Sequence, residues 1–237
     1  MITPYKCMDK PMKNITHCVR CGACCLKGGP VLHHEDKKLL LDGRIRYEHL
    51  VTIRRGEPVY NPLRGRLEQA SQEIVKVTGK GEKRSCRFYN EKDVSCAVYE
   101  HRFLECRLLK CWDTAEIMRI IGRDTILRRD VINRGDPIMS VIEAHEKECP
   151  AHEVETLITA ASAGNDRRKI FSRLSEIVDK DISMRSYAVF ELGLKAEYEL
   201  FIFGRPVSKL LNDRGLAVLT QERPANKPSD DRGRPSK

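Results

Sequence analysis

Apolar residues recur at helical spacing through the second half of the chain. Stripes with intervals of three and four positions cover residues 138–145, 154–161 and 170–178. This spacing gathers apolar side chains on one face of a helix. A further apolar stretch, residues 200–203, ends at a glycine. We therefore predict that residues 113–220 are helical.

The first half is patterned differently. Residues 73–78 are rich in β-branched side chains and are followed by Gly79, which predicts a strand. We expect residues 87–89 to pair with this strand in a small sheet that presents Cys86. Residues 34–41 are predicted as a short helix ended by Asp42 and Gly43, and residues 47–53 as its helical continuation.

Residues near the expected ends of these helices also indicate where the helices begin. Residues 113–116, Asp-Thr-Ala-Glu, resemble a capping box ahead of the next apolar stripe. Asn165 and Asp166 are expected to cap the helix that carries the stripe at 170–178. The last segment, residues 221–237, has almost no hydrophobic side chains and is predicted to be disordered.

Together these patterns predict an α+β fold that is mainly α. An irregular, metal-stapled cysteine-rich region with a small β element, residues 1–112, is expected to pack as one unit on the helical region 113–220. A chain of 237 residues can bury a real core and needs no metal merely to fold. Its apolar runs are shorter than the roughly 18–20 residues of a membrane span, and its N-terminus lacks a signal-peptide stretch. We expect a cytoplasmic protein with no membrane contact.

Cysteine is the most informative residue type. Nine of the ten cysteines precede residue 112. In the reducing cytosol, such density indicates metal binding or redox chemistry rather than disulfides. The densest run is Cys18-x2-Cys21-x2-Cys24-Cys25. A C-x2-C step lets two sulfurs approach one metal ion at about 2.3 Å.

The backbone and the spacing of this run have further consequences. Gly22 suits a turn that requires a positive φ. Three cysteines at this spacing supply three corners of one site, as in iron–sulfur sequences. We expect Cys25 to point away from Cys24, so that it serves a second metal, bridges two metals or stays free.

A second group of cysteines follows at wider intervals: Cys86, Cys96, Cys106 and Cys111. With the first run they give eight candidate metal ligands, enough for one four-sulfur site with spares or for two such sites. Cys7 and Cys149 are expected to be packing residues instead. His17 and His101 are weaker candidate ligands, whereas His33 and His34 are expected at a solvent-facing helix start.

The order of these residues resembles a known family. The matching features are the cysteine run at 18–25, Cys86-x-Phe-Tyr, Cys96-x-Val-Tyr and Arg102 before Cys106-Arg107. They resemble the CxxCxxCC cysteine-cluster family, the YkgJ-like proteins, which are described as zinc- or iron-chelating. Phe103 stands where the family usually has proline. A related domain in flagellin lysine N-methylases is associated with an iron–sulfur cluster, so the resemblance implies a metal or cluster site but no particular reaction.

Several functions remain open at this point. We favour an iron–sulfur cluster, 4Fe-4S, over zinc, because the first run has cubane-like spacing and the second group lacks a C-x2-C pair. The alternative is an enzyme that uses the site, either a protein-modifying methyltransferase-like protein or a redox catalyst. The sequence contains no Gly-x-Gly-x-x-Gly, P-loop or Gly-x-Ser-x-Gly motif. The partner is an unknown protein or small molecule.

The charge is concentrated in the cysteine half. Residues 1–112 carry 22 basic and 13 acidic side chains, whereas residues 113–237 carry 21 of each. A basic half is compatible with a zinc-stapled nucleic-acid-binding module. We prefer a different interpretation, in which the basic side chains offset thiolate charge. Four arginines stand close to cysteines in the sequence: Arg20, Arg87, Arg102 and Arg107.

Overall fold

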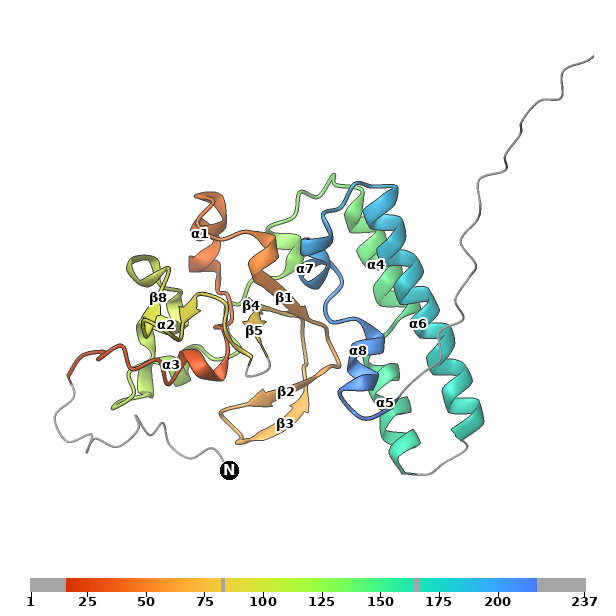
Figure 1. The fold of residues 1–237 in the computed structure, drawn as a ribbon, viewed down its shortest axis with the longest axis horizontal. Helices are drawn as coiled ribbons and strands as arrows, with labels where there is room; N and C mark the ends of the chain where they lie inside the picture. Colours follow the sequence, from red (N-terminus) through yellow and green to blue (C-terminus); the bar gives the residue numbers. More distant parts are fainter. Residues whose placement is uncertain (1–15, 82–83, 164–166, 217–237) are drawn as a thin grey trace, which may run out of the picture.

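The computed structural model describes residues 16–81, 84–163 and 167–216 of the chain (Figure 1). The fold is mixed and mainly helical, with several small antiparallel strand pairs. The longer helices belong to the second half of the sequence. The predicted fold class is therefore confirmed. None of the described helices is both long and apolar enough to cross a membrane.

The largest strand pair joins β1 (Leu50–Ile53) to β4 (Ile74–Val77) in antiparallel register, with Leu50 opposite Val77. The predicted strand at 73–78 is thus confirmed. The helix predicted at 47–53 is wrong beyond its first residues, because only Tyr47–His49 form a turn of 3-10 helix (η3). From Leu50 onward the backbone pairs with β4 instead, and β-branched side chains favour that extended state.

Three further hairpins surround this pair. β2 (Pro58–Asn61) pairs with β3 (Arg66–Gln69), β5 (Gly79–Lys80) with β6 (Ser85–Cys86), and β7 (Tyr89–Asn90) with β8 (Ser95–Cys96). The predicted pairing of residues 87–89 with the strand at 73–78 is present at one position only, where the Arg87 amide donates a 3.0 Å hydrogen bond to the Thr78 oxygen. The rest of that strand pairs with β1, and Tyr89 pairs with Cys96 instead. Cys86 nevertheless lies at the end of β6, in the short β5–β6 hairpin that follows β4 in the chain.

Short helical turns complete the first half. η1 (Cys25–Lys27) follows the first cysteine run, and η2 (His34–Asp36) leads into α1 (Lys37–Leu41). The helix predicted at 34–41 is therefore confirmed, with its first turn tightened to 3-10 geometry. η4 (Tyr99–His101), α2 (Leu104–Leu108) and α3 (Ala115–Ile120) follow the last hairpin. Of the expected capping box, Asp113 accepts a hydrogen bond from the Ala115 amide at 2.9 Å, whereas the Glu116 carboxylate accepts one from Lys110 at 2.7 Å.

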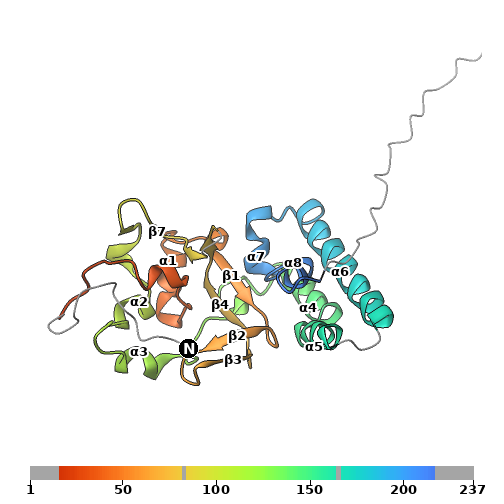
Figure 2. The same ribbon diagram turned by 60° about the horizontal axis from the view of Figure 1, so that its bottom comes forward.

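The second half contains the helices that the apolar stripes predict. They are α4 (Ile138–Glu148), α5 (Ala151–Ser162), α6 (Arg167–Phe190) and α7 (Glu199–Ile202). The same half also contains α8 (Val207–Asn212) and the 3-10 turns η5 (Arg128–Asp130) and η6 (Ala196–Tyr198), which no stripe predicts. Figure 2 shows them grouped on one side of the molecule, with the strands and cysteine-rich segments on the other. The cap expected at Asn165 and Asp166 and the tail at 221–237 lie outside the described residues.

Two clusters of buried side chains stabilise this arrangement. One cluster combines strand residues of the first half, such as Leu50 and Val75, with Ile142 and Phe201 of the second half. The other is confined to the helical half and contains Cys149. Because the first cluster draws on both halves, each half buries part of its apolar surface against the other.

Buried polar groups also join the halves. Arg54 is fully buried, pairs with Glu57 and donates a 2.8 Å hydrogen bond to the backbone oxygen of Cys149. His145 Nε2 lies 2.7 Å from a carboxylate oxygen of Asp181, which lies on α6. Arg54 Nη1 lies 3.5 Å from the other ring nitrogen of His145. Because an arginine only donates, this places the proton of His145 on Nε2, where it is donated to Asp181.

Candidate metal centre

The first cysteine run follows an irregular backbone. Gly22 has φ +75° and Arg20 has φ +56°, both in the left-handed region. The Leu26 amide donates to the Gly22 oxygen at 2.9 Å, and the Lys27 amide donates to the Cys24 oxygen at 3.1 Å. These bonds close a tight turn over residues 22–27. The expectation of a positive φ at Gly22 is confirmed.

The second group of cysteines comes from four separate short elements. Cys86 ends β6 and Cys96 ends β8, so each is held by one hairpin. Cys106 lies on α2, and Cys111 lies beside a backbone bridge between Lys110 and Asp113. Each element is only two to five residues long, which explains why no periodic pattern in the sequence marks this group.

All eight candidate cysteines line one cavity of about 300 Å³. Its walls combine the first run with the second group, although 60 residues separate Cys25 from Cys86 in the sequence. Aromatic side chains that the spacing of the cysteines does not indicate also line it, among them Phe88, Tyr89 and Trp112. The structure therefore brings together every cysteine of the predicted set. Their role as metal ligands stays a prediction.

The sulfurs of Cys24 and Cys25 lie 3.9 Å apart. Two thiolates on one tetrahedral ion with bonds of about 2.3 Å are separated by about 3.8 Å. Our expectation that Cys25 points away from its neighbour is therefore wrong. Cys24 lies in the αR region and Cys25 opens η1, and the two side chains turn toward each other from there. Across the described ranges, no three His, Cys, Asp or Glu side chains meet closely enough to hold a metal ion as they stand.

Comparison with known proteins identifies this region. Residues 17–121 match the model of the CxxCxxCC family, which carries the description "Putative zinc- or iron-chelating domain". We call residues 17–121 the CxxCxxCC domain after this similarity. The match supports metal binding without choosing between zinc and iron. No curated protein and no solved structure shows significant similarity to the chain.

The thiols of the CxxCxxCC domain influence one another electrostatically. The hydrogen bond from the Cys25 thiol is the largest influence on Cys24 and lowers its pKa to about 6, whereas the pKa of Cys25 is raised by the same contact. Burial, and then the charges of neighbouring thiolates, raise the pKa values of Cys86 and Cys106. Several of these thiols can ionise together only if a cation compensates them.

Two of the four arginines close to cysteines lie at this cavity. The guanidinium carbons of Arg20 and Arg102 lie 3.8 and 4.2 Å from the centre of the Tyr99 ring, and all three side chains line the cavity. Arg102 also contributes to the lowered pKa of Cys24. Charge compensation by these two residues is therefore consistent with the geometry.

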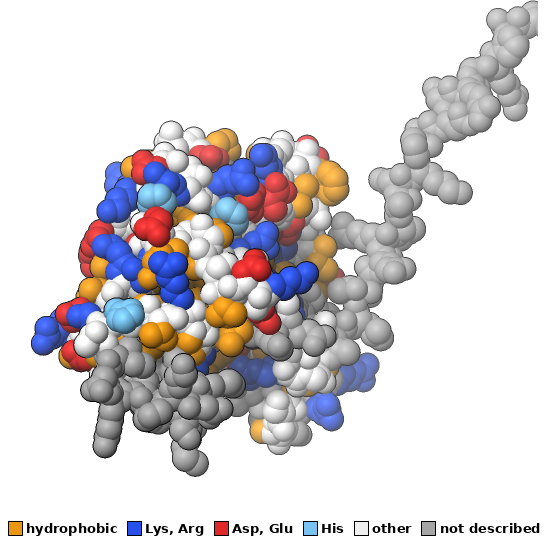
Figure 3. Space-filling view, turned by 60° about the vertical axis from the view of Figure 1, so that its left-hand side comes forward, with side chains coloured by type: hydrophobic (Ala, Val, Ile, Leu, Met, Phe, Trp, Pro, Cys, Tyr) orange, Lys and Arg blue, Asp and Glu red, His pale blue; other side chains and the backbone are white. Residues whose placement is uncertain are grey.

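The other two arginines do not line the cavity. Arg107 forms an ion pair with Glu35, and Arg87 is exposed to solvent. On the face of the domain in Figure 3, basic side chains are interspersed with acidic and hydrophobic ones.

The four histidines considered as candidate ligands also differ in whether they line the cavity. His17 lines the cavity, whereas His101 is exposed and is not part of the wall. His33 is buried rather than solvent-facing, with Nε2 3.6 Å from a carboxylate oxygen of Glu105. His34 is exposed, as expected, and lies 3.8 Å from Asp130. Neither His33 nor His34 lines the cavity.

Cys149 is separate from this centre. It is fully buried in the cluster of the helical half, and burial raises the pKa of its thiol to about 12. Its sulfur lies 3.6 Å from the backbone oxygen of Ile177. The expected packing role is consistent with this position. Cys7 lies outside the described residues.

Proposed function

We propose that the CxxCxxCC domain binds an iron–sulfur cluster, 4Fe-4S, through cysteine thiolates, in the reducing cytosol. The observation that carries this proposal is the single cavity of about 300 Å³ whose wall contains all eight cysteines. Thiols crowded in this way raise one another's pKa values, and a metal cation removes that penalty. The donor set is chemically suited to iron or zinc.

The residues of the first run have the clearest role. Cys18, Cys21 and Cys24 would provide three ligands at C-x2-C-x2-C spacing, and one cysteine of the second group would provide the fourth. Cys24 is the best prepared of them, because its pKa of about 6 leaves it ionised at neutral pH. When bound, a cluster of this kind would supply one-electron transfer or a Lewis-acidic iron.

The remaining wall would tune the site. Arg20 and Arg102 would offset the negative charge of the ligands, and hydrogen bonding near sulfur affects the reduction potential of a cluster. Phe88 and Trp112 would limit access of water. Binding of the cluster requires the thiols to move toward one another, since no three His, Cys, Asp or Glu side chains among the described residues lie close enough together to hold a metal ion.

Zinc is the main competitor, because it also accepts four thiolates. The spacing of the first run and the lack of a C-x2-C pair in the second group support iron. Anaerobic purification of the full chain, followed by visible absorption and by iron, sulfide and zinc analysis, separates the two. We expect a coloured protein with about four iron and four sulfide per chain. A colourless protein with about one or two zinc ions per chain would overturn the choice of iron.

Two matched variants test the position of the site. Cys21→Ser should release the metal and destabilise the CxxCxxCC domain, since binding and local folding are coupled. Cys149→Ser should retain the metal, because Cys149 lies in the other half and its replacement can still donate toward the Ile177 oxygen. Full metal content in Cys21→Ser would show that the site is elsewhere.

A partner of the loaded domain is expected to be a protein or a small molecule rather than a nucleic acid. The net charge of +9 is balanced in part by ligand thiolates once metal is bound. Retention of the loaded protein on a heparin column should therefore be lost at modest salt. Strong, salt-dependent retention would favour a nucleic-acid-binding module instead.

A further inference from the structure

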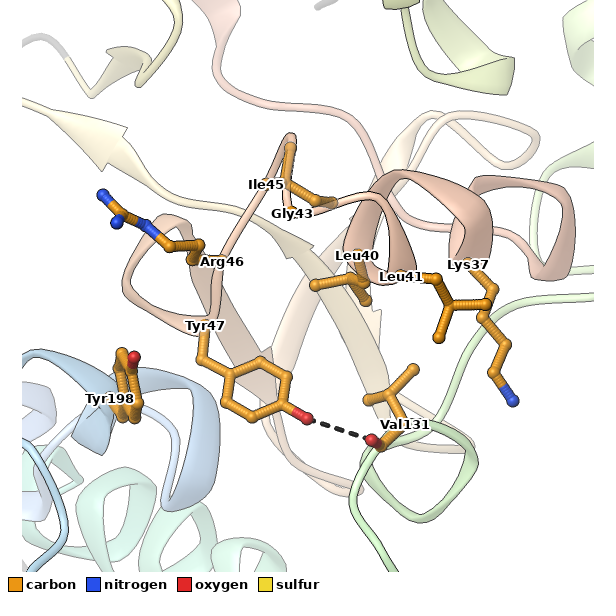
Figure 4. Close-up of a pocket in the computed structure, with 9 residues that line it drawn as sticks. All are labelled: Lys37, Leu40, Leu41, Gly43, Ile45, Arg46, Tyr47, Val131 and Tyr198. Carbon is orange, nitrogen blue, oxygen red and sulfur yellow. Dashed lines mark hydrogen bonds between the residues drawn. The ribbon is translucent and has the colours of Figure 1, made fainter.

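A second hollow, of about 250 Å³, shares no wall residue with the cysteine cavity. It lies where α1 and the turn after it meet η5 and η6, so both halves of the chain contribute (Figure 4). Ligand sites often form at such junctions. Its wall consists of Lys37, Leu40, Leu41, Gly43, Ile45, Arg46, Tyr47, Val131 and Tyr198.

The aromatic side of the hollow is held in place by contacts within the protein. The Tyr47 ring stacks on Phe201 with centroids 4.4 Å apart and meets the edge of Tyr198 at 5.6 Å. Its hydroxyl donates a 2.9 Å hydrogen bond to the Val131 oxygen, as Figure 4 shows. This wall is therefore formed before any ligand arrives, which reduces the ordering cost of binding.

The opposite side is apolar and only partly covered. Ile45 is buried and Leu40 is half-buried, but Leu41 at the rim is 77% exposed. A flat apolar ligand between these side chains and the tyrosines would remove exposed apolar surface from water. A cavity of about 150 Å³ lined by apolar side chains holds benzene. The larger hollow is therefore of a size for one or two fused rings.

The two charged side chains in the wall of this hollow are both basic. Lys37 makes no ion pair with any residue that the structure describes, whereas Arg46 is paired with Glu48 at 2.7 Å. Figure 4 places Lys37 and Arg46 on opposite sides of the hollow. Burial, and then the negative charge of Asp136, raise the pKa of Tyr47, so its phenol stays neutral and adds no negative charge. An anionic group would therefore bind beside Lys37.

From these contacts we propose that this hollow binds a small aromatic carboxylate. The ring lies between the tyrosine wall and the leucines, and the carboxylate pairs with the Lys37 amine. This site is independent of the metal centre, because no residue is common to the two walls. It adds a small-molecule binding function to the proposed one.

The test uses two probes that differ in charge, 2-naphthoate and 2-naphthalenemethanol, titrated calorimetrically into the full chain as purified. We expect saturable binding of 2-naphthoate to a single site. Lys37→Gln should weaken this binding by about fivefold, the value of a partly exposed ion pair, and leave the neutral probe unaffected. Lys38→Gln is the matched control, because Lys38 is exposed on the same helix and lies outside the hollow.

A steric variant tests the location of the ring. Leu40→Trp should fill the hollow and abolish binding of both probes, with folding checked by circular dichroism. Absence of saturable 2-naphthoate binding to the wild-type chain would overturn the proposal. Equal effects of Lys37→Gln and Lys38→Gln, or binding that survives Leu40→Trp in a folded protein, would overturn it as well.

Discussion

A methyl group built on Gly22 would lie 2.0 Å from the hydroxyl oxygen of Tyr89. Gly22 stands inside the first cysteine run, and Tyr89 begins β7, between Cys86 and Cys96. The tyrosine ring therefore packs directly against the backbone of the run. This contact holds the two cysteine groups against each other and depends on the missing side chain at position 22.

Gly22→Ala should therefore lower both metal content and the free energy of unfolding. The positive φ costs an L-residue roughly 1 kcal/mol, and the clash with Tyr89 adds to that cost. Gly122→Ala is the matched control, since Gly122 has φ +71° but no atom within 4 Å of the added methyl. Metal analysis and urea unfolding measure the difference. If both variants lose stability equally and both keep their metal, the contact with Tyr89 has no special role.

The Cys24–Cys25 contact predicts selective reactivity in the metal-free protein. Cys24 should react with iodoacetamide with a midpoint near pH 6, because its thiolate accepts a hydrogen bond from Cys25. Cys25→Ala removes that donor, so the midpoint for Cys24 should move to higher pH. Cys111, whose pKa is raised mainly by burial, is the internal reference that reacts only at higher pH. Peptide mapping by mass spectrometry follows each thiol, and equal midpoints for Cys24 and Cys111 would contradict the prediction.

Local patterns predict the long helices of the second half and the cysteines that line the cavity. The stripes at 138–145 and 154–161 lie within α4 and α5, because each of these helices buries one face against a neighbour. The segment 47–53 was mispredicted because its extended state depends on pairing with Ile74–Val77, a partner more than 20 positions away. Periodicity over a few residues does not contain that information.

The contacts of Cys25 and His145 were also not predicted, because they too depend on the folded chain and not on neighbouring residues in the sequence. Sequence adjacency suggested that Cys24 and Cys25 diverge, whereas their sulfurs meet because of the turn that η1 begins. His145 was predicted only as part of a helical stripe. Its partners, Asp181 and Arg54, are 36 and 91 positions away, and only the folded chain brings them to one place.

The buried pair His145 and Asp181 predicts loss of stability in acid. Burial lowers the pKa of His145. For Asp181, burial alone would raise the pKa, but the hydrogen bond from His145 and the charge of Arg185 outweigh burial, so that the pKa of Asp181 is lowered. Groups whose pKa values are lowered on folding stabilise the protein above their unfolded-state values. The free energy of unfolding should therefore fall first as the pH drops below about 6.5, and again below about 4.

Asp181→Ala should cost about 3–5 kcal/mol at neutral pH, because it leaves the other buried partners uncompensated. It should also steepen the loss of stability between pH 7 and pH 5, because the contact with Asp181 raises the pKa of His145 against the effect of burial. Asp179→Ala, two positions away and exposed, is the matched control. Urea unfolding followed by circular dichroism at pH 7 and pH 5 measures both effects. A wild-type chain that is equally stable at both pH values would contradict the role of this pair.

Removal of the metal should loosen one half of the molecule and spare the other. The hairpin of β7 and β8 has only two residues in each strand, which is too short for stability without other contacts. Its position beside the cysteine cavity makes the metal an obvious source of those contacts. α5 and α6 instead share a buried cluster that contains Val154, Leu174 and Ile177. After chelation, hydrogen exchange should become faster at Tyr89 and Cys96 while amides of these two helices stay protected.

The same experiment on Cys21→Ser distinguishes loss of metal from an effect of the chelator. The variant should show fast exchange in β7 and β8 without chelator, and chelation should change it no further. Cys149→Ser should behave as the wild-type chain does in these strands, both before and after chelation. Uniform loss of protection across α5 and α6 would contradict the prediction, because it would mean that the two halves unfold together. The core shared by β1, β4 and α7 would then couple the halves, and the separate cluster of the helical half would not be enough to keep α5 and α6 folded.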